Sequence, residues 1–332
     1  MKIIITTPAE PGSKAGNRAT AERWQALLAA AGHSVTVITE YGGEPCDAFI
    51  ALHAWRSADA MRRFRQAWPH KPLVLALTGT DIYRYQHECP EDTIYSMAEA
   101  DALIGLHAQV DRDIPPQYAC KLVTLFQSAD EPDAHPSPTT GRATVSFNIC
   151  VIGHLRNEKD SLRAAYAARL LPEDSDIQVF CAGKPHTAEW QRMAEQEMQQ
   201  NPRFQWLGEL EKKEMGQLMT NSRAMVISSV MEGGANVVSE ACRAGLPVIA
   251  SNISGNVGLL GKNYPGYFPV KDEQALAGLL YRTEQEPDFL ATLKSRVNAL
   301  ARRFVPDKEQ ASLEQALSLA IQRCSDRTTP NP

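Results

Sequence analysis

The chain has 332 residues, of which 43% are hydrophobic and 22% are charged, and its formal net charge at pH 7 is −5. A length and composition of this kind predict two globular domains, each able to bury a core. The acidic balance argues against a general nucleic-acid-binding protein, which normally carries a basic face. No apolar run is long enough to span a bilayer, and the opening MKIIITTPAE predicts a first strand and not a signal peptide.

Short apolar runs alternate with helical stretches along the chain, which is the pattern of an α/β protein. In the first part, the stretch Gly16–Ala31 places Trp24 and Leu28 on one face of a helix. Before and after it, we expect strands at Lys2–Thr6, Ser34–Thr39, Ala48–Leu52, Leu73–Leu77, Ala102–Leu106 and Leu122–Leu125.

The stretch Ser128–Arg142 is rich in proline and small polar residues and predicts an interdomain linker, which we place at residues 131–143. It separates an N-terminal domain at residues 1–130 from a second domain at residues 144–305. In the second domain we expect strands at Ser146–Ile152, Ile177–Cys181, Phe204–Trp206, Ala224–Ser228 and Val248–Ala250, with helices that begin near Lys159, His186, Glu211 and Ala235.

The end of the chain carries no strand pattern. Residues 274–324 predict two or three helices, broken near Pro287 and Pro306. The last of them, at residues 306–325, could return to the N-terminal domain. Two Rossmann-like, doubly wound domains in succession predict a cleft between the carboxyl ends of their sheets, so the loops that follow strands are the candidate binding loops.

The first such loop, residues 7–20, is neither a Walker A sequence nor a GxGxxG fingerprint. Gly16 and Asn17 would open the following helix, and Lys14 and Arg18 would lie near its positive end. This composition fits an anion pocket, and a plain surface loop is the alternative.

The second loop, residues 78–84, follows an apolar strand directly and reads TGTDIYR. Thr78, Thr80 and Arg84 could contact an acceptor substrate. Asp81 could orient that substrate or serve as a general base. Alternatively, Asp81 simply caps the helix that follows.

The third loop runs from Gly153 to Lys159 and contains His154. Arg156 and Lys159 lie three residues apart near the start of a helix, where both could face a diphosphate. Solvated side chains after a strand are the alternative.

The fourth loop belongs to the stretch 228–258, which predicts a strand, a glycine loop, a helix and another strand. A helix N-terminus presents unpaired N–H groups, and Gly233 and Gly234 would let a phosphate approach the backbone. Ala235 and Asn236 open the helix, and Asn236 can cap the turn. An anion site at this helix is the functional interpretation.

Two carboxylates frame the same helix. Glu240 lies about one turn inside it and could accept two hydrogen bonds from a ribose diol. Glu232 precedes it and could accept from sugar hydroxyls. Together these features predict a nucleotide-sugar site, against the alternative of a glycine turn with two solvated glutamates.

The seven cysteines are scattered along the chain without a CxxC pair. This spacing predicts free thiols in a reducing cytoplasm. The histidines lack the spacing of metal ligands, so we expect neither a bound metal nor a cofactor.

At these residues the chain resembles the retaining, GT-B-fold glycosyltransferases of family 4. The family's Glu-x7-Glu signature matches Glu232 and Glu240, its Gly-x-Pro-Val-Ile-Ala-Ser strand matches residues 245–251, and its Gly-x-Leu-x-x-x-Lys loop matches residues 153–159. The resemblance implies that Glu232 contacts the donor sugar, Glu240 the ribose, and Arg156 and Lys159 the diphosphate. It also implies that catalysis needs no metal.

Two departures from the family pattern concern the reacting groups. His154 stands where the family has an arginine, so Arg156 would act from a different position. Thr78 stands where the family has a histidine beside the reacting carbon, which puts the usual alcohol-acceptor chemistry in doubt.

The segments GNRATAERW, LTGTDIYR, GHLRNEKD and EGGANVVSEACRAGLPVIAS are similar to the selenosugar synthase branch of the family. That resemblance implies transfer of a sugar from a UDP-sugar, with UDP-N-acetylglucosamine as the expected donor, to selenophosphate. Lys14, Arg18 and Arg84 would then hold the phosphoryl oxygens. An anionic nucleophile of this kind needs little help from a base, which fits Thr78.

Two other functions stay open at this point. One is a family 4 glycosyltransferase that acts on an alcohol or thiol acceptor. The other is a nucleotide-sugar sensor without catalytic activity. Neither a nucleic acid nor a membrane is an expected partner.

Overall fold

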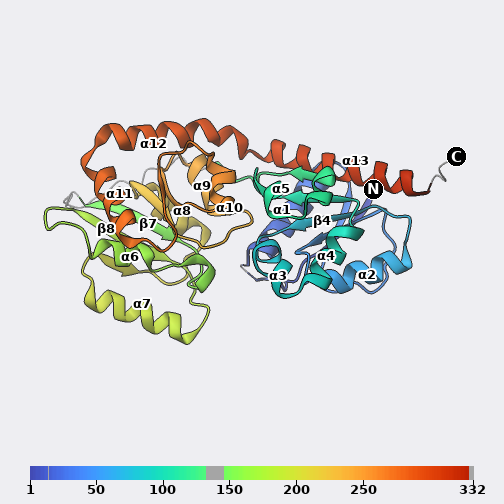
Figure 1. Ribbon diagram of the computed structural model, residues 1–332, viewed down its shortest axis with the longest axis horizontal. Coiled ribbons are helices and arrows are strands. Elements are labelled where there is room, and N and C mark those ends of the chain that lie inside the picture. The colour runs from blue at the N-terminus through green and yellow to red at the C-terminus, as the bar shows by residue number, and fades with distance from the viewer. Residues whose placement is uncertain (14, 132–145, 329–332) are drawn as a thin grey trace. The chain divides into compact units, whose positions relative to one another are not determined.

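The computed structural model describes residues 1–13, 15–131 and 146–328 (Figure 1). It divides into two compact units. Unit 1 comprises Met1–Ser128, Glu232–Gly234 and Val305–Pro332, and unit 2 comprises Ala129–Met231 and Ala235–Phe304. Lys14 and nearly all of the expected linker, residues 132–143, lie outside the described residues.

Unit 1 is built on a six-stranded parallel sheet in the order β2-β1-β3-β4-β5-β6. The strands are β1 (Lys2–Thr6), β2 (Ser34–Ile38), β3 (Ala48–Leu52), β4 (Leu73–Leu77), β5 (Ala102–Gly105) and β6 (Leu122–Thr124). The helical segments are α1 (Gly16–Ala30), α2 (Ala58–Ala67), a π-helical turn η1 (Asp81–Tyr85), α3 (Gln86–Glu88), α4 (Pro90–Glu99), α5 (Val110–Asp113), the 3-10 helix η2 (Pro116–Lys121) and α13 (Pro306–Thr328).

Helices cover both faces of this sheet, whose central strands β3, β4 and β5 are apolar and fully buried. Ile3 and Ile5 of β1 face the layer formed by α1 and α13, where they pack in one cluster with Trp24. Ile4 faces the opposite layer, formed by α2 and α4, and packs in one cluster with Phe64. The alternation of successive side chains thus produces a three-layer α/β/α unit.

Unit 2 is built on a second six-stranded parallel sheet in the order β12-β11-β10-β7-β8-β9. The strands are β7 (Phe147–Ile152), β8 (Ile177–Ala182), β9 (Phe204–Trp206), β10 (Ala224–Ile227), β11 (Val248–Ser251) and β12 (Tyr267–Phe268). The helical segments are η3 (Asn157–Lys159), α6 (Arg163–Ala168), α7 (Ala188–Gln200), α8 (Lys212–Thr220), α9 (Asn236–Arg243), α10 (Ser254–Leu260), α11 (Glu273–Gln285), α12 (Pro287–Leu300) and η4 (Ala301–Arg303).

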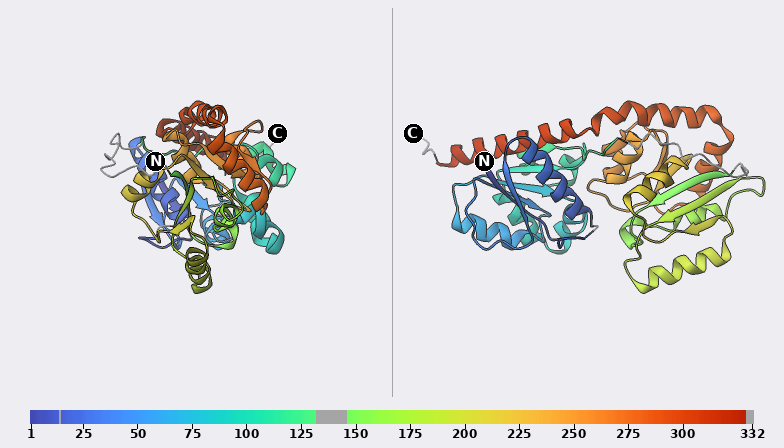
Figure 2. Two further views of the ribbon diagram at one scale, coloured as in Figure 1. Left: turned by 90° about the vertical axis from the view of Figure 1, so that its left-hand side faces the viewer. Right: turned by 180° about the vertical axis from the view of Figure 1, so that it is seen from behind.

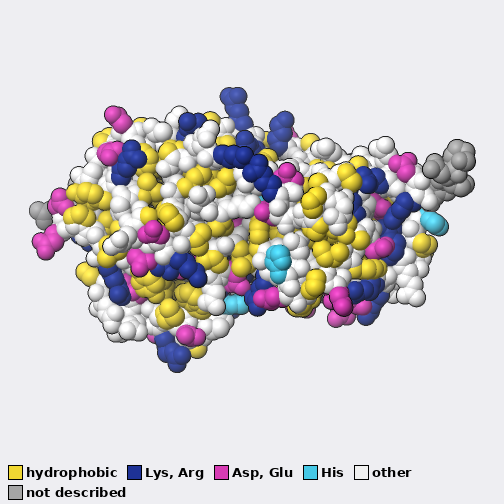
Figure 3. Space-filling model, in the orientation of Figure 1, with side chains coloured by type: hydrophobic (Ala, Val, Ile, Leu, Met, Phe, Trp, Pro, Cys, Tyr) yellow, Lys and Arg dark blue, Asp and Glu magenta, His cyan; other side chains and the backbone are white. Residues whose placement is uncertain are grey.

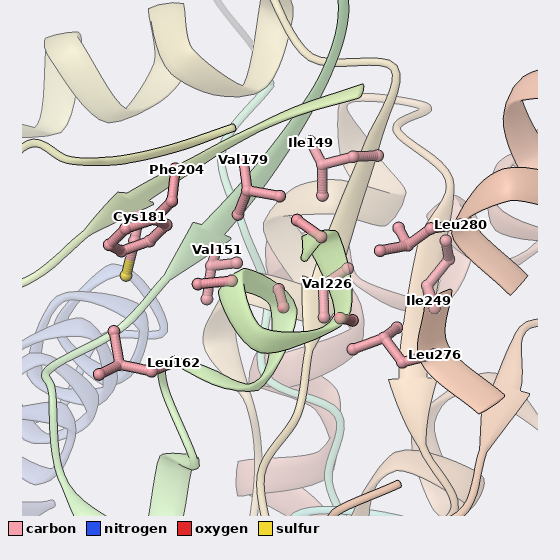
Figure 4. Close-up of a cluster of buried hydrophobic side chains, with 14 of the residues drawn as sticks. Ile149, Val151, Leu162, Val179, Cys181, Phe204, Val226, Ile249, Leu276 and Leu280 are labelled. Carbon is pink, nitrogen blue, oxygen red and sulfur yellow. The ribbon is translucent and has the colours of Figure 1, made fainter. Parts of the chain in front are cut away.

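The core of unit 2 lies between this sheet and helices α6 and α11. Val151 and Val179 of neighbouring strands lie in one buried cluster with Leu276 and Leu280 of α11 (Figure 4). Leu162, directly before α6, belongs to the same cluster. As in unit 1, the helices flank the sheet in layers, as the two views of Figure 2 show.

The expectation of two doubly wound parallel sheets with helices at the C-terminus is confirmed. Each expected strand is present within one residue of its predicted bounds, and among the described residues the two-residue strand β12 is the one strand without a prediction. The helix expected near Lys159 begins later, at Arg163. Asp160 between them has a left-handed backbone, with φ of 46°, which interrupts the helix.

All seven cysteines are free thiols, as the sequence predicts, and burial raises the pKa of Cys150, Cys181 and Cys242 to about 12. Within the described residues, no helix is long and apolar enough to cross a membrane. Figure 3 shows basic and acidic side chains interspersed over the visible face, in keeping with the small net charge.

One buried carboxylate, that of Glu309, holds helix α13 against the rest of unit 1. Glu309 is fully buried and accepts hydrogen bonds from Arg23 Nε at 2.9 Å and from Trp24 Nε1 at 2.7 Å. It also accepts from the backbone N–H of Ser128 at 2.7 Å and from the Ser128 hydroxyl. One side chain therefore joins α13 to α1 and to the segment that leaves β6. At the far end of α13, Arg327 pairs with the buried Asp101 at 2.6 Å.

We expect Glu309→Gln to destabilise unit 1 by about 3–5 kcal/mol, because it leaves the Arg23 charge without its buried partner. Urea unfolding followed by tryptophan fluorescence measures this change. Glu314→Gln is the matched control, since Glu314 lies on the same helix and pairs with His33 near the surface. The control should lose no more than about 1 kcal/mol. Equal losses in the two variants would contradict the anchoring role of Glu309.

Candidate active site

Each sheet has one position where the direction of winding reverses. In unit 1 it lies between β1 and β3, and in unit 2 between β7 and β10. Ligands of doubly wound sheets bind outside the carboxyl ends of the strands at such positions.

Unit 2 has a small hollow at this position, lined by Val151, Ile152, Gly153, Lys159, Ser161, Val226, Ile227, Ser228 and Ser229. Its walls come from the carboxyl ends of β7 and β10 and from the loop after β7. A separate hollow in unit 1, beside Lys2, Asp47 and Lys71, lies at the amino ends of the strands and is not a candidate on this criterion.

Two glycines fix the start of the loop after β7. A Cβ atom on Gly183, directly after β8, would lie 2.0 Å from the carbonyl oxygen of Gly153. Only a glycine at position 183 allows this approach. Leu155, in the same loop, donates its N–H to Lys184 O at 3.0 Å and accepts from His186 N at 2.9 Å. The loop is thereby held as a short extension of the sheet.

The other end of the loop is tied to the loop after β10. Ser228 Oγ lies 2.9 Å from Asp160 O and 3.2 Å from Lys159 O. The N–H of Val230 donates to Glu158 O at 2.9 Å. Lys159 is therefore presented from a backbone that is fixed on both sides.

Arg156 and Lys159 are the two cations of this loop. Arg156 is about one-third exposed, and its Nε lies 3.9 Å from the Glu158 carboxylate. That Nε atom is itself buried and has no hydrogen-bond partner within the described residues. The Lys159 stem passes over Gly153, where a Cβ atom would lie 3.8 Å from Lys159 Cδ. The backbone oxygen of His154 accepts from Ser161 Oγ at 3.1 Å. Lys159 thus lines the hollow of unit 2, and Arg156 lies three residues earlier in the same loop.

Helix α9 begins at Asn236 with Ala235 at its N-cap, and no side chain caps it. The capping role expected for Asn236 is therefore wrong, because Asn236 is already the first helical residue. The first turn of α9 contains no acidic side chain, so its N–H groups and partial positive charge suit an anion. Glu240 lies one turn further along α9 and is partly buried. Glu232 is 8% exposed and belongs to unit 1.

In unit 1, Asp81 is fully buried beneath the loop after β4. Its carboxylate accepts the N–H of Gly79 at 2.7 Å, of Thr78 and Ala54 at 3.0 Å, and of Ile82 at 3.1 Å. Four backbone donors occupy its lone pairs. The expectation that Asp81 serves as a general base is therefore wrong, and the residue instead holds the Thr78–Ile82 loop in shape.

The segment Glu232–Gly234 of unit 1 lies against the same loop. A Cβ on Gly233 would lie 2.3 Å from the carbonyl carbon of Thr78 and 2.4 Å from Gly79 N. Gly234 approaches Gln127, whose side-chain oxygen would lie 2.6 Å from an added Cβ. Close contacts within unit 1 thus explain why positions 233 and 234 are glycines. A bound phosphate is not needed to explain them.

The remaining acceptor candidates lie on two elements of unit 1. Gly16 and Asn17 open α1, and a Cβ on Gly16 would meet open space. Arg18 pairs with Glu22 through Nε at 2.6 Å, and its buried Nη1 has no partner within the described residues. Arg84 is 44% exposed and pairs with Glu88 at 2.9 Å.

Sequence reasoning missed two buried histidines at the carboxyl edge of this sheet. His53 directly follows β3 and His107 follows β5 by two residues. Burial lowers the pKa of His107 to about 4, against the opposing charge of Asp113. His107 Nδ1 accepts from the N–H of Gln109 at 3.2 Å, and Nε2 lies 2.7 Å from the Tyr83 hydroxyl. A histidine within two residues of the end of an apolar strand is the sequence signal that indicates both.

Residues 139–299 match the family model described as glycosyl transferases group 1. Among solved structures, HepE from Anabaena in complex with UDP and glucose is 17% identical, with a TM-score of 0.78 over 96% of this chain and 99% of that chain. Sucrose-phosphate synthase from Thermosynechococcus elongatus is 16% identical, with a TM-score of 0.79 over 95% and 97%. A glycosyltransferase from Rickettsia africae is 14% identical, with a TM-score of 0.71 over 96% and 98%. The chain has the GT-B fold, and the group 1 match falls on its second half.

We expect Gly183→Ala to displace the loop after β7, because the new methyl group would overlap the Gly153 carbonyl. The variant should lose about 1–3 kcal/mol of stability. Hydrogen exchange at residues 154–159 should also become faster. The control is Gly216→Ala in α8, where nothing lies within 4 Å of the added Cβ and about 0.5–1 kcal/mol of stability should be gained. Unchanged exchange in Gly183→Ala would show that the two glycines do not fix the loop.

Proposed function

We propose that this chain is a glycosyltransferase that moves a sugar from a UDP-sugar to selenophosphate and releases UDP. One observation carries the donor half of this proposal. The segment matched by the group 1 model contains the switch-point hollow of unit 2, with the Arg156–Lys159 loop at its edge.

In the proposed donor site, Arg156 and Lys159 hold the diphosphate together with the N–H groups that open α9. Arg156 Nε supports this role, because it is a buried donor without a partner in the described part of the chain. Such a donor costs stability unless a ligand pairs with it. Glu240 accepts from the ribose hydroxyls, and Glu232 accepts from the sugar hydroxyls. The UDP and UDP-glucose bound to HepE are consistent with this choice of donor.

The acceptor half of the proposal rests on the hydrogen bonds of three possible bases, which are His53 after β3, Asp81 after β4 and His107 after β5. Asp81 accepts from four backbone N–H groups, and His53 and His107 each accept a backbone N–H through Nδ1. Their remaining nitrogens lie within hydrogen-bonding distance of Thr80 and Tyr83. None of the three is free to take a proton from an acceptor. An acceptor that arrives already ionised, as selenophosphate does, needs no such base.

In the proposed reaction, a selenium lone pair of selenophosphate attacks the anomeric carbon. The bond between that carbon and the UDP oxygen breaks, and UDP leaves with the electron pair. The cations of the donor site and the α9 N-terminus stabilise the charge on the leaving UDP. Hydrolysis of the Se–P bond by water then yields a selenosugar and phosphate. UDP-N-acetylglucosamine is the proposed donor.

The phosphoryl oxygens of the acceptor would be held in unit 1. Arg18 is the best-supported cation there, because its Nη1 is buried and unpartnered within the described residues. Arg84, Asn17 and the hydroxyls of Thr78 and Thr80 complete the proposed set, together with Lys14. We place the reaction in the cytoplasm, because a chain with seven free thiols suits a reducing compartment.

Steady-state UDP release tests the function directly. We expect purified protein to release UDP only when UDP-N-acetylglucosamine and selenophosphate are both present. Simple sugars and low-molecular-weight thiols should not replace selenophosphate. Equal release with an alcohol or thiol acceptor would support the broader glycosyltransferase function and refute selenophosphate as acceptor. Binding of the UDP-sugar without turnover for any acceptor would refute an enzymatic role.

Substitutions in the donor site should separate binding from turnover. Glu240→Ala should weaken UDP binding by about 1–3 kcal/mol, since the ribose hydroxyls lose their acceptor. Glu232→Ala and Arg156→Ala should lower kcat more than they weaken UDP binding. Titration calorimetry and kcat measurements distinguish the two effects, with the exposed Arg192→Ala as a control in unit 2, where Arg156 and Glu240 lie. Equal losses of binding and turnover in all three variants would contradict these separate roles.

A further inference from the structure

His53 occupies an unusual backbone position at the switch point of unit 1. It follows β3 directly, is 2% exposed, and has a positive φ of 79°. A residue other than glycine in this region carries backbone strain, which persists only where the surrounding structure enforces it. Strained residues of this kind gather at functional sites, so the surroundings of His53 bear on the acceptor site.

The hydrogen bonds of His53 determine which ring nitrogen carries its proton. Nδ1 lies 3.2 Å from the backbone N–H of Arg56 and accepts from it. Burial lowers the pKa of His53, and the nearby Asp81 carboxylate opposes this shift only in part. The ring is therefore neutral near pH 7, with its proton on Nε2. That N–H donates to the Thr80 hydroxyl at 3.0 Å.

This hydrogen bond dictates the direction of the Thr80 hydroxyl proton. Because Thr80 Oγ1 accepts from His53, its own O–H must point toward a different group. Among the described residues, nothing accepts that proton, and Thr80 is partly exposed. The backbone around Thr80 is held by the Asp81 carboxylate through Gly79 and Ile82. Thr80 therefore presents an oriented donor from a rigid loop at the carboxyl edge of the sheet.

We propose that His53 is a positioning residue that turns the Thr80 hydroxyl into a hydrogen-bond donor for an oxygen of an anionic, phosphate-like acceptor. The inference rests on the proposed function for the identity of that acceptor. His53 itself does not touch the substrate in this account. It acts through Thr80, at the loop where Thr78 replaces the histidine of family 4 enzymes.

Neighbouring aromatic rings allow a packing role of the His53 ring to be tested separately from its hydrogen bond to Thr80. Trp55 and Tyr85 stack with ring centroids 3.9 Å apart, and the Tyr85 centroid lies 5.7 Å from that of His53. A phenylalanine at position 53 would keep a ring of similar size beside this stack but lose the Nε2 donor. A glutamine would keep an N–H near Thr80 but lose the ring. The two substitutions therefore test packing and hydrogen bonding independently.

The test is a kinetic double-mutant cycle. His53→Phe and Thr80→Val should each raise KM for selenophosphate about tenfold, while KM for the UDP-sugar stays within about twofold. His53→Gln should restore most of the loss. The double variant should be no worse than Thr80→Val alone, because His53 acts only through that hydroxyl. His87→Gln, an exposed histidine in α3, is the control and should change nothing.

Additive losses in the double variant would overturn the proposal, as would equal effects on both substrates or a glutamine variant as poor as the phenylalanine one. If His53→Phe fails to fold, His53→Leu takes its place in the cycle, because leucine also lacks a donor for the Thr80 hydroxyl.

Calorimetric titration with inorganic phosphate separates this inference from the proposed function. Weaker phosphate binding in Thr80→Val and His53→Phe, in a protein that does not use selenophosphate, would refute the function but leave the positioning role intact. Phosphate binding that is the same in all variants would refute the positioning role.

Discussion

Parallel pairing of all strands is the constraint on which the rest of the molecule depends. In a parallel sheet every strand ends at the same edge, so the loops that follow the strands collect there. In unit 2 this brings the loop after β7 and the loop after β10 to one hollow, although about seventy residues separate them in the chain. In unit 1 it brings His53, Thr80 and the start of α1 to a single edge of the sheet. The chemistry proposed here follows from that arrangement.

Buried polar groups at these edges fall into two classes. Asp81 and Glu309 have their acceptor capacity filled by backbone and side-chain donors, and they hold loops and helices in place. Arg156 Nε, Arg18 Nη1 and the buried Thr7 hydroxyl have no hydrogen-bond partner within the described residues. Each of these groups carries a desolvation cost, which a hydrogen bond to a ligand would offset. All three belong to segments that follow β1 or β7, the strands at the switch points. A ligand with several oxygens could accept hydrogen bonds from them.

The sequence was sufficient to predict the fold because the central strands of both sheets are fully buried, although edge strands such as β2 are partly exposed. Strands covered on two faces appear as continuous apolar runs, and Leu73–Leu77 is one whose bounds were predicted without error. The two-residue strand β12 was missed because Tyr267–Phe268 is too short to show a pattern. The interruption of the helix near Lys159 was not predicted, because it depends on the left-handed backbone of Asp160. An aspartate in the sequence does not by itself indicate that conformation.

The candidate site was predicted less completely, for a physical reason. Residue type and spacing indicated Arg156 and Lys159 but could not show how many donors surround a carboxylate. The position of Asp81 after a buried strand therefore predicts a base, whereas four backbone N–H groups occupy its carboxylate. The role of Gly183 depends on the closeness of Gly153, thirty residues earlier, and that of His53 on a φ angle and one contact to Thr80. Such facts arise only from tertiary structure.

The most direct test of the central claim is an NMR spectrum of the product formed from selenophosphate and UDP-N-acetylglucosamine that carries an isotopic label at its anomeric carbon. We expect a one-bond coupling between that carbon and selenium, together with one UDP released for each product molecule. A product whose anomeric carbon is bonded to oxygen or sulfur, formed while selenophosphate remains unconsumed, would contradict it.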